Sequence, residues 1–381
     1  DGGPTNWAAN IIAGFGGTES MREFVFETGD FMPTYDTFNL PVATRSGLLN
    51  DPEAISTGGG SVTINYRNDP IAHDLTNADA YRFSSLVNND PFTFVARAYP
   101  GDSVKISLAH GAQEGQHSFG VHGARWLQEG SNTNSGYTNK QEYGISEHFE
   151  MYFDLGDGLK HTVGPSGNTD FLTGSLTTPD LRGGMYGLIR AHGSQQPDLS
   201  LLPNNANWTL RPSHPLALGI CPTGPGAPPK KSFALEAWRV GDLIGSQGLH
   251  LTERFGYRDP NALVFVHADE VPDIISGARA LEPLVLRVNA GDCIDVALEN
   301  MLPLTLPQFL GSNTGSSRVS LHPQLLSYDM GTSDGASIGR NPDSTVGPGE
   351  TRLFAWYAGE VAGDDLGNVT WTPIEYGVTN L

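Results

Sequence analysis

Positive charge and cysteine are both scarce in this chain. Its 381 residues include 42 acidic residues against 22 lysines and arginines, which gives a formal net charge of −20 at pH 7. This surplus argues against nucleic acid or an anionic membrane surface as a partner and is compatible with cationic ligands or metals. No apolar run approaches the roughly 20 residues of a membrane span, and no helical period of three turns or more stands out. We therefore expect no membrane span and no helical bundle.

Turn-forming residues, by contrast, are abundant: 47 glycines and 26 prolines punctuate the sequence. The segment Ala98–Asp102 contains a tight-turn signal, and the apolar residues Val104, Ile106 and Leu108 follow it at every second position. That period is typical of a half-buried strand. The composition and the pattern together predict an all-β protein.

The strand signature occurs twice. Residues Phe94–Leu108 align with Leu284–Leu298 without a gap, at an offset of 190 residues. A weaker match sets Arg22–Phe26 against Lys231–Leu235, each an apolar strand that opens a unit. A repeat of this kind indicates tandem copies of one β-domain, which we place at residues 1–215 and 220–381.

The two cysteines occupy informative positions. Cys221 lies in a segment rich in proline and glycine at the entrance to the second domain, and Cys293 lies on the repeated strand. We expect a disulfide between them, the alternative being two buried free thiols. A disulfide would imply an exported protein. Neither cysteine has a neighbouring histidine, which argues against a nucleophile or a copper thiolate.

The most informative stretch is GAQEGQHSFGVHGARW, which places His117 and His122 on one strand that leaves a turn. Two imidazoles this close suggest a metal pair at the end of a sandwich. The alternative is that both are buried, hydrogen-bonded core residues. His148, on a later strand of the same domain, is a further candidate ligand. The other histidines of this domain and its neighbour have no paired spacing and are interpreted as ordinary residues: His73, His110, His161, His192, His214, His250 and His267.

Several runs carry a family resemblance that covers nearly all of the chain in order, among them MREFVFETGDFMPTYD, GGMYGLIRAHG, CPTGPGAP, PLVLRVNAGDCIDVALENMLP and SLHPQLLSYDMGTSDGASIGRN. The chain resembles the large bacterial multicopper oxidases with several cupredoxin domains, the group that includes the manganese oxidases. The resemblance implies tandem cupredoxin-like Greek-key β-sandwiches, copper as cofactor, and oxidation of metal ions or phenol-like donors by dioxygen.

The copper ligands of that family are incomplete here. Where its even domains have H-P-x-H-x-H-G, this chain has His117, Gly120 and His122, so the middle ligand is missing. The closing strand is present as Gly183–Ile189, but no H-C-H strand precedes it. The first domain is therefore expected to be an even-type domain with a degenerate copper strand. A blue-copper site cannot form there without a thiolate.

The second domain corresponds to the family's odd type. At the strand where the subgroup has S-x-H-x-H, this chain keeps His322 and has Gln324 in place of the second histidine. The loop Tyr328–Gly335 carries aspartate and serine side chains that would suit calcium. The alternative is that these side chains cap turns.

Three functions remain open. We favour a segment or subunit of a multicopper oxidase in which this chain acts mainly as scaffold and interface. A self-contained copper oxidase is disfavoured by the missing ligands. The third is a structural or assembly protein that has lost copper.

The second copy contains no match to the closing strand GGMYGLIR. We therefore expect another polypeptide to complete that domain, beside Trp356, Trp371 and Tyr376, and to carry the full copper sites. The expected location is extracellular, periplasmic or at the cell surface.

Overall fold

The structure is a computed structural model of the chain. It describes residues 7–12, 20–32, 61–70, 79–111, 115–130, 132, 135–155, 167–206, 221, 227, 229–245, 248–252, 255–289, 291–306, 308–309, 313–314, 316–363 and 369–373.

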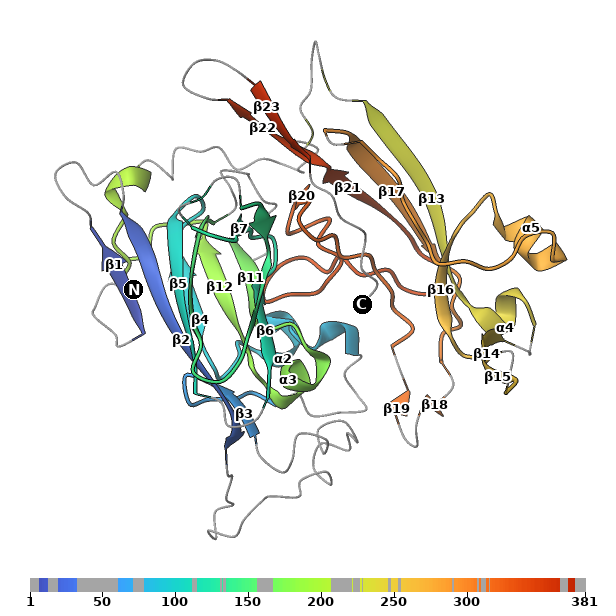
Figure 1. Cartoon of the computed structure of the whole chain (residues 1–381), viewed down its shortest axis with the longest axis horizontal. Coiled ribbons are helices and arrows are strands. Elements are labelled where there is room, and N and C mark those ends of the chain that lie inside the picture. The colour runs from blue at the N-terminus through green and yellow to red at the C-terminus, as the bar shows by residue number, and fades with distance from the viewer. Residues whose placement is uncertain are drawn as a thin grey trace, which may run out of the picture. The chain divides into compact units, whose positions relative to one another are not determined.

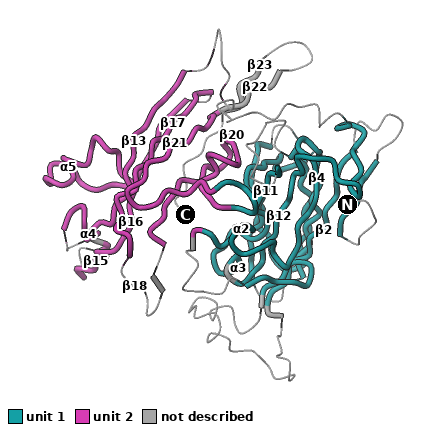
Figure 2. The backbone as a smooth tube through the Cα atoms, turned by 180° about the vertical axis from the view of Figure 1, so that it is seen from behind, with its two compact units in different colours: residues 1–77, 81–215, 338–342 teal, residues 78–80, 216–337, 343–381 magenta. Residues whose placement is uncertain are grey.

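The chain folds into two compact units (Figure 2). Unit 1 contains residues 1–77, 81–215 and 338–342, and unit 2 contains residues 78–80, 216–337 and 343–381. The main break lies beside the predicted boundary, and each unit also takes one short segment from the other half of the sequence. Whether each unit is a complete cupredoxin-like domain stays a prediction.

Unit 1 is a β-sandwich of two five-stranded sheets (Figure 1). The first sheet has the order β1-β2-β5-β10, with β3 beside β2. The second has the order β4-β12-β11-β6-β9. Each sheet contains one parallel pair, β2 with β5 and β4 with β12. The all-β class predicted from the sequence is confirmed. The strands are β1 Ala8–Ile11, β2 Met21–Met32, β3 Ser61–Ile64, β4 Val95–Ala98, β5 Ser103–His110, β6 His117–Val121, β9 Lys140–Tyr143, β10 His148–Asp154, β11 Asn168–Ser175 and β12 Tyr186–His192.

The interior of the sandwich is filled by side chains that alternate along the strands. On β5, Val104, Ile106 and Leu108 are buried, as their spacing predicts. Across the layers, the rings of Phe26 on the first sheet and Phe94 beside the second lie 4.5 Å apart between centroids. Burial of one such side chain contributes about 1.5–3 kcal/mol. The sheets are therefore held face to face by apolar packing.

Short elements complete unit 1. They are the paired strands β7 Trp126–Leu127 and β8 Tyr137–Thr138, the helices α2 Ser85–Asn88 and α3 Thr178–Gly183, and the 3-10 turns η1 Asp79–Tyr81 and η2 Pro203–Asn205. Helix α3 has a proline in its first turn and is capped at its C-terminus by Gly184, whose φ of 93° suits glycine.

The segment 338–342 joins unit 1 through a buried polar network. The side chain of Asn341 accepts the backbone N–H of Asp170 and donates to its carbonyl, at 2.8 and 2.6 Å. The Asp170 carboxylate also accepts Nε of Arg190 at 2.7 Å, and Arg190 binds Asp90 through two further nitrogens. Each buried charge in this network therefore has a partner, which is the condition for burying it at low cost.

Unit 2 is built on one described five-stranded sheet with the order β16-β13-β17-β21-β20. Its strands are β13 Lys230–Arg239, β16 Leu263–His267, β17 Cys293–Asn300, β20 Ser327–Tyr328 and β21 Thr351–Tyr357. The sheet is accompanied by three described strand pairs and two described helices. The strand pairs are β14 Leu249–Thr252 with β15 Tyr257–Asp259, β18 Gln308–Phe309 with β19 Asn313–Thr314, and β22 Gly359–Gly363 with β23 Val369–Pro373. The helices are α4 Val240–Leu243 and α5 Val271–Ser276.

The repeat predicted from the sequence is confirmed in the pairing of β5 and β17, whereas Leu284–Val288, the counterpart of β4, forms no strand. Strand β5 pairs in parallel with β2, and β17 pairs in parallel with β13. Arg22 lies opposite Val104 and Lys231 lies opposite Ile294, so the two registers agree at the predicted offset. On the other edge, β10 and β21 run antiparallel to these central strands.

The turn before each central strand is also the same. Gly101 and Gly291 have φ of 79° and 84°, which favours glycine. The carboxylate of Asp102 accepts the N–H of Tyr99 at 2.7 Å, and that of Asp292 accepts the N–H of Asn289 at 2.8 Å. Asp102 also forms a buried ion pair with Arg22, for which Asp292 has no counterpart among the described residues.

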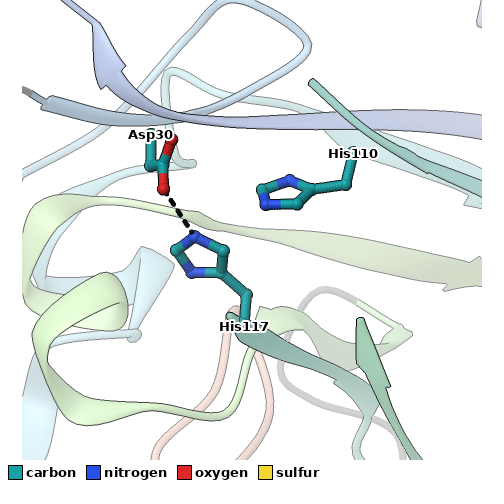
Figure 3. Close-up of side chains that lie close together, drawn as sticks. All are labelled: Asp30, His110 and His117. Atoms are coloured by element: carbon teal, nitrogen blue, oxygen red, sulfur yellow. Dashed lines mark hydrogen bonds and ion pairs between the residues drawn. The ribbon is translucent and has the colours of Figure 1, made fainter. Parts of the chain in front are cut away.

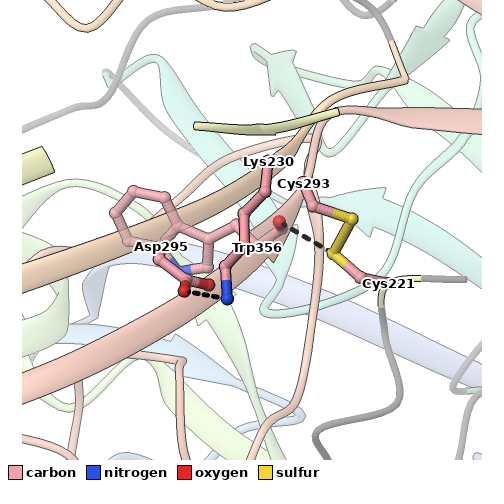
Figure 4. The surroundings of a disulfide bond; sticks show 5 residues. All are labelled: Cys221, Lys230, Cys293, Asp295 and Trp356. Atoms are coloured by element: carbon pink, nitrogen blue, oxygen red, sulfur yellow. Dashed lines mark hydrogen bonds and ion pairs between the residues drawn. A yellow bond between two sulfur atoms is a disulfide. The ribbon is translucent and has the colours of Figure 1, made fainter. Parts of the chain in front are cut away.

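The disulfide between Cys221 and Cys293 is present, as predicted (Figure 4). It joins residues 72 positions apart in sequence, with their Cα atoms 5.8 Å apart. Cys293 begins β17, so the bond fastens the entrance of unit 2 to its central strand. With both cysteines of the chain bonded, no free thiol remains.

Among the described residues, none of the helices has the length and apolar character needed to cross a membrane.

The two turns give a matched pair of substitutions. Asp102→Ala should destabilise unit 1 by about 3–5 kcal/mol, because it leaves Arg22 buried without its counter-charge. Asp292→Ala should cost only about 1 kcal/mol, because it removes a turn hydrogen bond and the residue equivalent to Arg22 is the exposed Lys231. Denaturant unfolding followed for each unit measures both. Equal losses of unfolding free energy in the two variants would show that the ion pair of Arg22 with Asp102 does not stabilise unit 1.

The disulfide predicts a second, separate effect. Its reduction, or the double substitution Cys221→Ser with Cys293→Ser, should destabilise unit 2 by about 4 kcal/mol through the chain entropy of the opened loop. Unit 1 contains neither cysteine and should unfold unchanged. Thermal unfolding with and without a reductant measures this. Loss of both transitions together would contradict it.

Candidate metal centre

Three buried side chains of unit 1 point toward one another: Asp30, His110 and His117 (Figure 3). One ligand atom of each lies within 4.8 Å of the others. The three residues are only 2%, 4% and 7% exposed. Carboxylate and imidazole groups in such a cluster are able to hold a transition-metal ion.

The sandwich brings these residues together from both sheets. Asp30 lies near the end of β2 and His110 ends β5, two parallel neighbours in which Thr28 pairs with His110. His110 continues the inward alternation of β5 beyond Leu108. His117 begins β6 on the other sheet. The group therefore lies between the two layers, where the central strands end.

His117 is held between two carboxylates. Its Nδ1 lies 2.7 Å from Asp180 Oδ2, and its Nε2 lies 3.3 Å from Asp30 Oδ2. Burial opposes a charge on His117, but these two carboxylates outweigh it and raise the pKa of the imidazole. Burial also acts against the charge on Asp180, yet hydrogen bonds from His117, Thr177 and Ser175 lower the pKa of that carboxyl.

His110 has a less complete set of partners. Its Nδ1 lies 2.8 Å from the Thr28 hydroxyl and 3.1 Å from the Thr28 carbonyl oxygen. Its Nε2 is buried with no hydrogen-bond partner in the described part of the chain. Burial, followed by the charge of His117, lowers the pKa of His110. The neutral imidazole is thus favoured at this position.

The remaining wall of the site is formed by Gly115 and Tyr143. The N–H of Gly115 donates to Asp30 Oδ2 at 2.7 Å. A side chain at Gly115 would place its Cβ 2.9 Å from Asp30 Oδ2 and 3.0 Å from His117 Nε2, so only glycine leaves these atoms room. The Tyr143 ring packs edge-on against His110, with centroids 4.9 Å apart.

The structure places the predicted ligands of this domain in different surroundings. His117 belongs to the group. His122 lies five residues after His117, directly beyond the end of β6, is half-buried, and is not a member of this group. His148 is exposed at the start of β10. Metal roles for His122 and His148 stay predictions. Asp30, His110 and Asp180 were missed by the sequence analysis, which interpreted His110 as ordinary.

His322 is buried in unit 2, 5% exposed. Its Nδ1 donates to the Asp334 carbonyl oxygen at 2.7 Å and lies 3.3 Å from the Asp334 carboxylate. Burial works against its charge, but Asp334 raises the pKa of His322 overall. Its role as a copper ligand stays a prediction.

The loop proposed for calcium follows His322. The carboxylate of Asp329 accepts the N–H of Gly331 at 3.0 Å and the hydroxyl of Thr332 at 2.9 Å. This is turn capping. The geometry of the loop therefore gives calcium no support.

Blue copper does not fit the residues of this chain. A type 1 site requires a thiolate together with two imidazoles. The chain has two cysteines, and both are in the disulfide. The group Asp30, His110 and His117 offers nitrogen and oxygen donors only.

Comparisons with known proteins identify no family for the chain. No protein-family profile matches it, and no curated protein matches it. Solved structures give weak similarities. A multicopper oxidase from Campylobacter jejuni described as a metallo-oxidase is 10% identical, with a TM-score of 0.25, over 45% of this chain and 30% of that one.

Two further structures cover more of the chain. A copper nitrite reductase from Nitrosomonas europaea is 13% identical, with a TM-score of 0.26, over 94% of this chain and 95% of its own. A multicopper oxidase from Pseudomonas thermotolerans is 10% identical, with a TM-score of 0.26, over 88% and 57%. At such values the similarities carry no argument about ligands or activity. The fold described above is assigned from its own strand topology, and the likeness to manganese oxidases stays a prediction.

The disulfide leads to a spectroscopic prediction. Addition of Cu²⁺ to the oxidised chain should produce no intense blue absorbance, because that band arises from a copper–thiolate bond. Visible absorption during a Cu²⁺ titration measures this, and a blue-copper protein serves as the positive control. An intense blue band from the oxidised chain would overturn the assignment of both sulfurs to the disulfide.

Proposed function

We propose that this chain is a segment or subunit of a multicopper oxidase that oxidises a metal ion or a small organic donor with dioxygen. In this proposal the chain acts mainly as scaffold and interface, and the full copper sites belong to another polypeptide. The sequence runs that resemble the family support the first part. The engagement of both cysteines in a disulfide supports the second, because electron entry in that family uses a thiolate. A disulfide also favours a location outside the cytoplasm.

One segment of unit 2 supports an interface with another polypeptide. Its counterpart in unit 1 pairs with a neighbouring strand, and the segment of unit 2 does not. In unit 1, Val95–Ala98 pairs in parallel with the closing strand β12. Ala96 and Ala98 are completely buried there. The equivalent residues of unit 2 are Val285–Val288. They belong to no strand pair among the residues that the structure describes.

The side chains of this segment are correspondingly uncovered. Val285 is 56% exposed, and Leu286 and Val288 are half-buried. An apolar segment whose backbone is unpaired among the residues that the structure describes is a template for a further strand. The occupant that fits is a strand of another polypeptide that runs parallel to Val285–Val288, as β12 runs parallel to β4. We assign the predicted partner to this edge.

The interface expected from the sequence beside Trp356, Trp371 and Tyr376 stays a prediction. Trp356, named there as part of the interface, is fully buried and donates from its indole to the Ser333 carbonyl oxygen at 3.1 Å. Tyr376 and the side chain of Trp371 lie outside the described residues.

A matched pair of substitutions tests the proposal. Val285→Lys puts a charge on the open segment, which opposes strand pairing. Leu353→Lys is the control, because Leu353 is equally exposed, at 57%, but its strand β21 already has its neighbours. Tagged full-length variants are isolated from the source cell, and assembly size and donor oxidation are measured. Val285→Lys should reduce both by about 10-fold or more, and Leu353→Lys should leave both unchanged.

Two outcomes would overturn the proposal. Isolation of the native chain as a monomer with oxidase activity would make it a self-contained oxidase. An intact assembly without oxidase activity would favour the alternative, a non-catalytic cupredoxin-fold structural or assembly protein that has lost copper. The lack of a free thiolate favours this second function, because a type 1 copper site requires one.

A further inference from the structure

The buried group of unit 1 has the hydrogen-bonding pattern of a prepared ligand set. Asp180 fixes one histidine. Its carboxylate accepts the hydroxyls of Ser175 and Thr177 at 2.8 and 2.6 Å, in addition to Nδ1 of His117 at 2.7 Å. A carboxylate only accepts, so the proton lies on Nδ1 and Nε2 is the nitrogen turned toward Asp30. A carboxylate behind a histidine is the usual support of a metal-binding imidazole.

The second histidine is fixed in the same way. A backbone carbonyl accepts only, so the contact of 3.1 Å between Nδ1 of His110 and the Thr28 oxygen places the proton on Nδ1. Nε2 then carries a lone pair. This atom is buried and has no hydrogen-bond partner in the described residues, and His110 belongs to the group formed with Asp30 and His117. A buried acceptor without a partner is rare and requires an explanation.

The repeat shows that the fold does not require a histidine at this position. The residue of unit 2 equivalent to His110 is Asn300, which is also buried at the end of its central strand. Its side-chain nitrogen donates to the carbonyl oxygens of Ser317 and Val346, both at 2.8 Å, and its oxygen accepts the N–H of Leu302. The same place in the fold is thus satisfied internally in unit 2 and left open in unit 1.

We propose that Asp30, His110 and His117 bind one divalent transition-metal ion, of the zinc or copper(II) type, through one carboxylate oxygen and two Nε2 atoms. Two imidazoles and one carboxylate suit these ions. Calcium and magnesium require oxygen donors throughout, and monovalent copper prefers sulfur. The site differs from a blue-copper centre because it has no thiolate. It also differs from the sequence-based pair of His117 with His122, since the second imidazole is His110.

The competing explanation is purely structural. In it, His117 is a permanent imidazolium between Asp30 and Asp180, and no ion enters. That arrangement accounts for the two ion pairs of His117. It leaves the buried Nε2 of His110 without a hydrogen bond of normal geometry, although the Gly115 backbone lies near this ring.

Metal binding by the full-length chain decides between these explanations. The chain is treated with a chelator and dialysed, and Zn²⁺ alone or Cu²⁺ alone is then titrated by calorimetry. The proposal expects one saturable ion per chain and a higher thermal midpoint for unit 1, because a ligand that binds only the folded state stabilises it. Cu²⁺ should give a paramagnetic resonance spectrum with coupling to two nitrogens and no blue band.

Three variants locate the ion. His110→Asn, which copies the residue at the equivalent place in unit 2, should abolish the saturable site and the second nitrogen coupling. His122→Gln and His148→Gln should leave both unchanged. Asp180→Asn should weaken affinity by about 10–100-fold with the same stoichiometry, because it disturbs only the support of His117. Circular dichroism of each variant confirms that it is folded.

Several outcomes would overturn the proposal. Binding that survives in His110→Asn but is lost in His122→Gln would favour the sequence-based pair. Binding that is equal in all variants would show adventitious surface ions only. No saturable binding in the native chain would leave the structural imidazolium. The experiment uses the metal alone, so its result does not depend on the proposed oxidase.

Discussion

The turn before the central strand is the constraint on which both units depend. A glycine with positive φ and the aspartate after it hold this turn, Gly101 with Asp102 in unit 1 and Gly291 with Asp292 in unit 2. Side chains alternate between the faces of a strand, so the point at which the strand begins decides which of them face the core. The neighbours of the central strand take their register from it on both edges.

The candidate metal site follows from which side chains of the central strand face the core. Three apolar residues of β5 face inward, and the next inward position is His110. In unit 2 the same count along β17 ends at Asn300. The parallel pairing of β2 with β5 then sets Thr28 beside His110 and brings Asp30 to the same end of the sandwich. The two units share this arrangement of strands. They differ at one equivalent position, where unit 1 has the candidate ligand His110 and unit 2 has the hydrogen-bonded amide of Asn300.

The sequence was sufficient for features that local patterns and the repeat determine. The two central strands, the strands parallel to them and the disulfide between Cys221 and Cys293 were all predicted and are present. His117 was identified as a candidate ligand, but its partners were not. Paired spacing in the sequence reveals only histidines that are neighbours along the chain, whereas the metal group joins Asp30 to a residue 87 positions later. One signal in the sequence pointed to it: the alternation of β5 continues to His110. The register that brings Asp30 to the same end of the sandwich is known only from the structure.

The chemistry of the donors divides the roles within the proposed assembly. With both cysteines in the disulfide, the described metal group presents two imidazoles and a carboxylate. Such donors favour copper(II) or zinc and offer little to copper(I), which prefers sulfur. The group Asp30, His110 and His117 therefore lacks the thiolate through which a type 1 copper receives electrons. In the proposed oxidase, another polypeptide supplies the thiolate of the redox cycle, and the proposal assigns the docking of that polypeptide to the segment Val285–Val288.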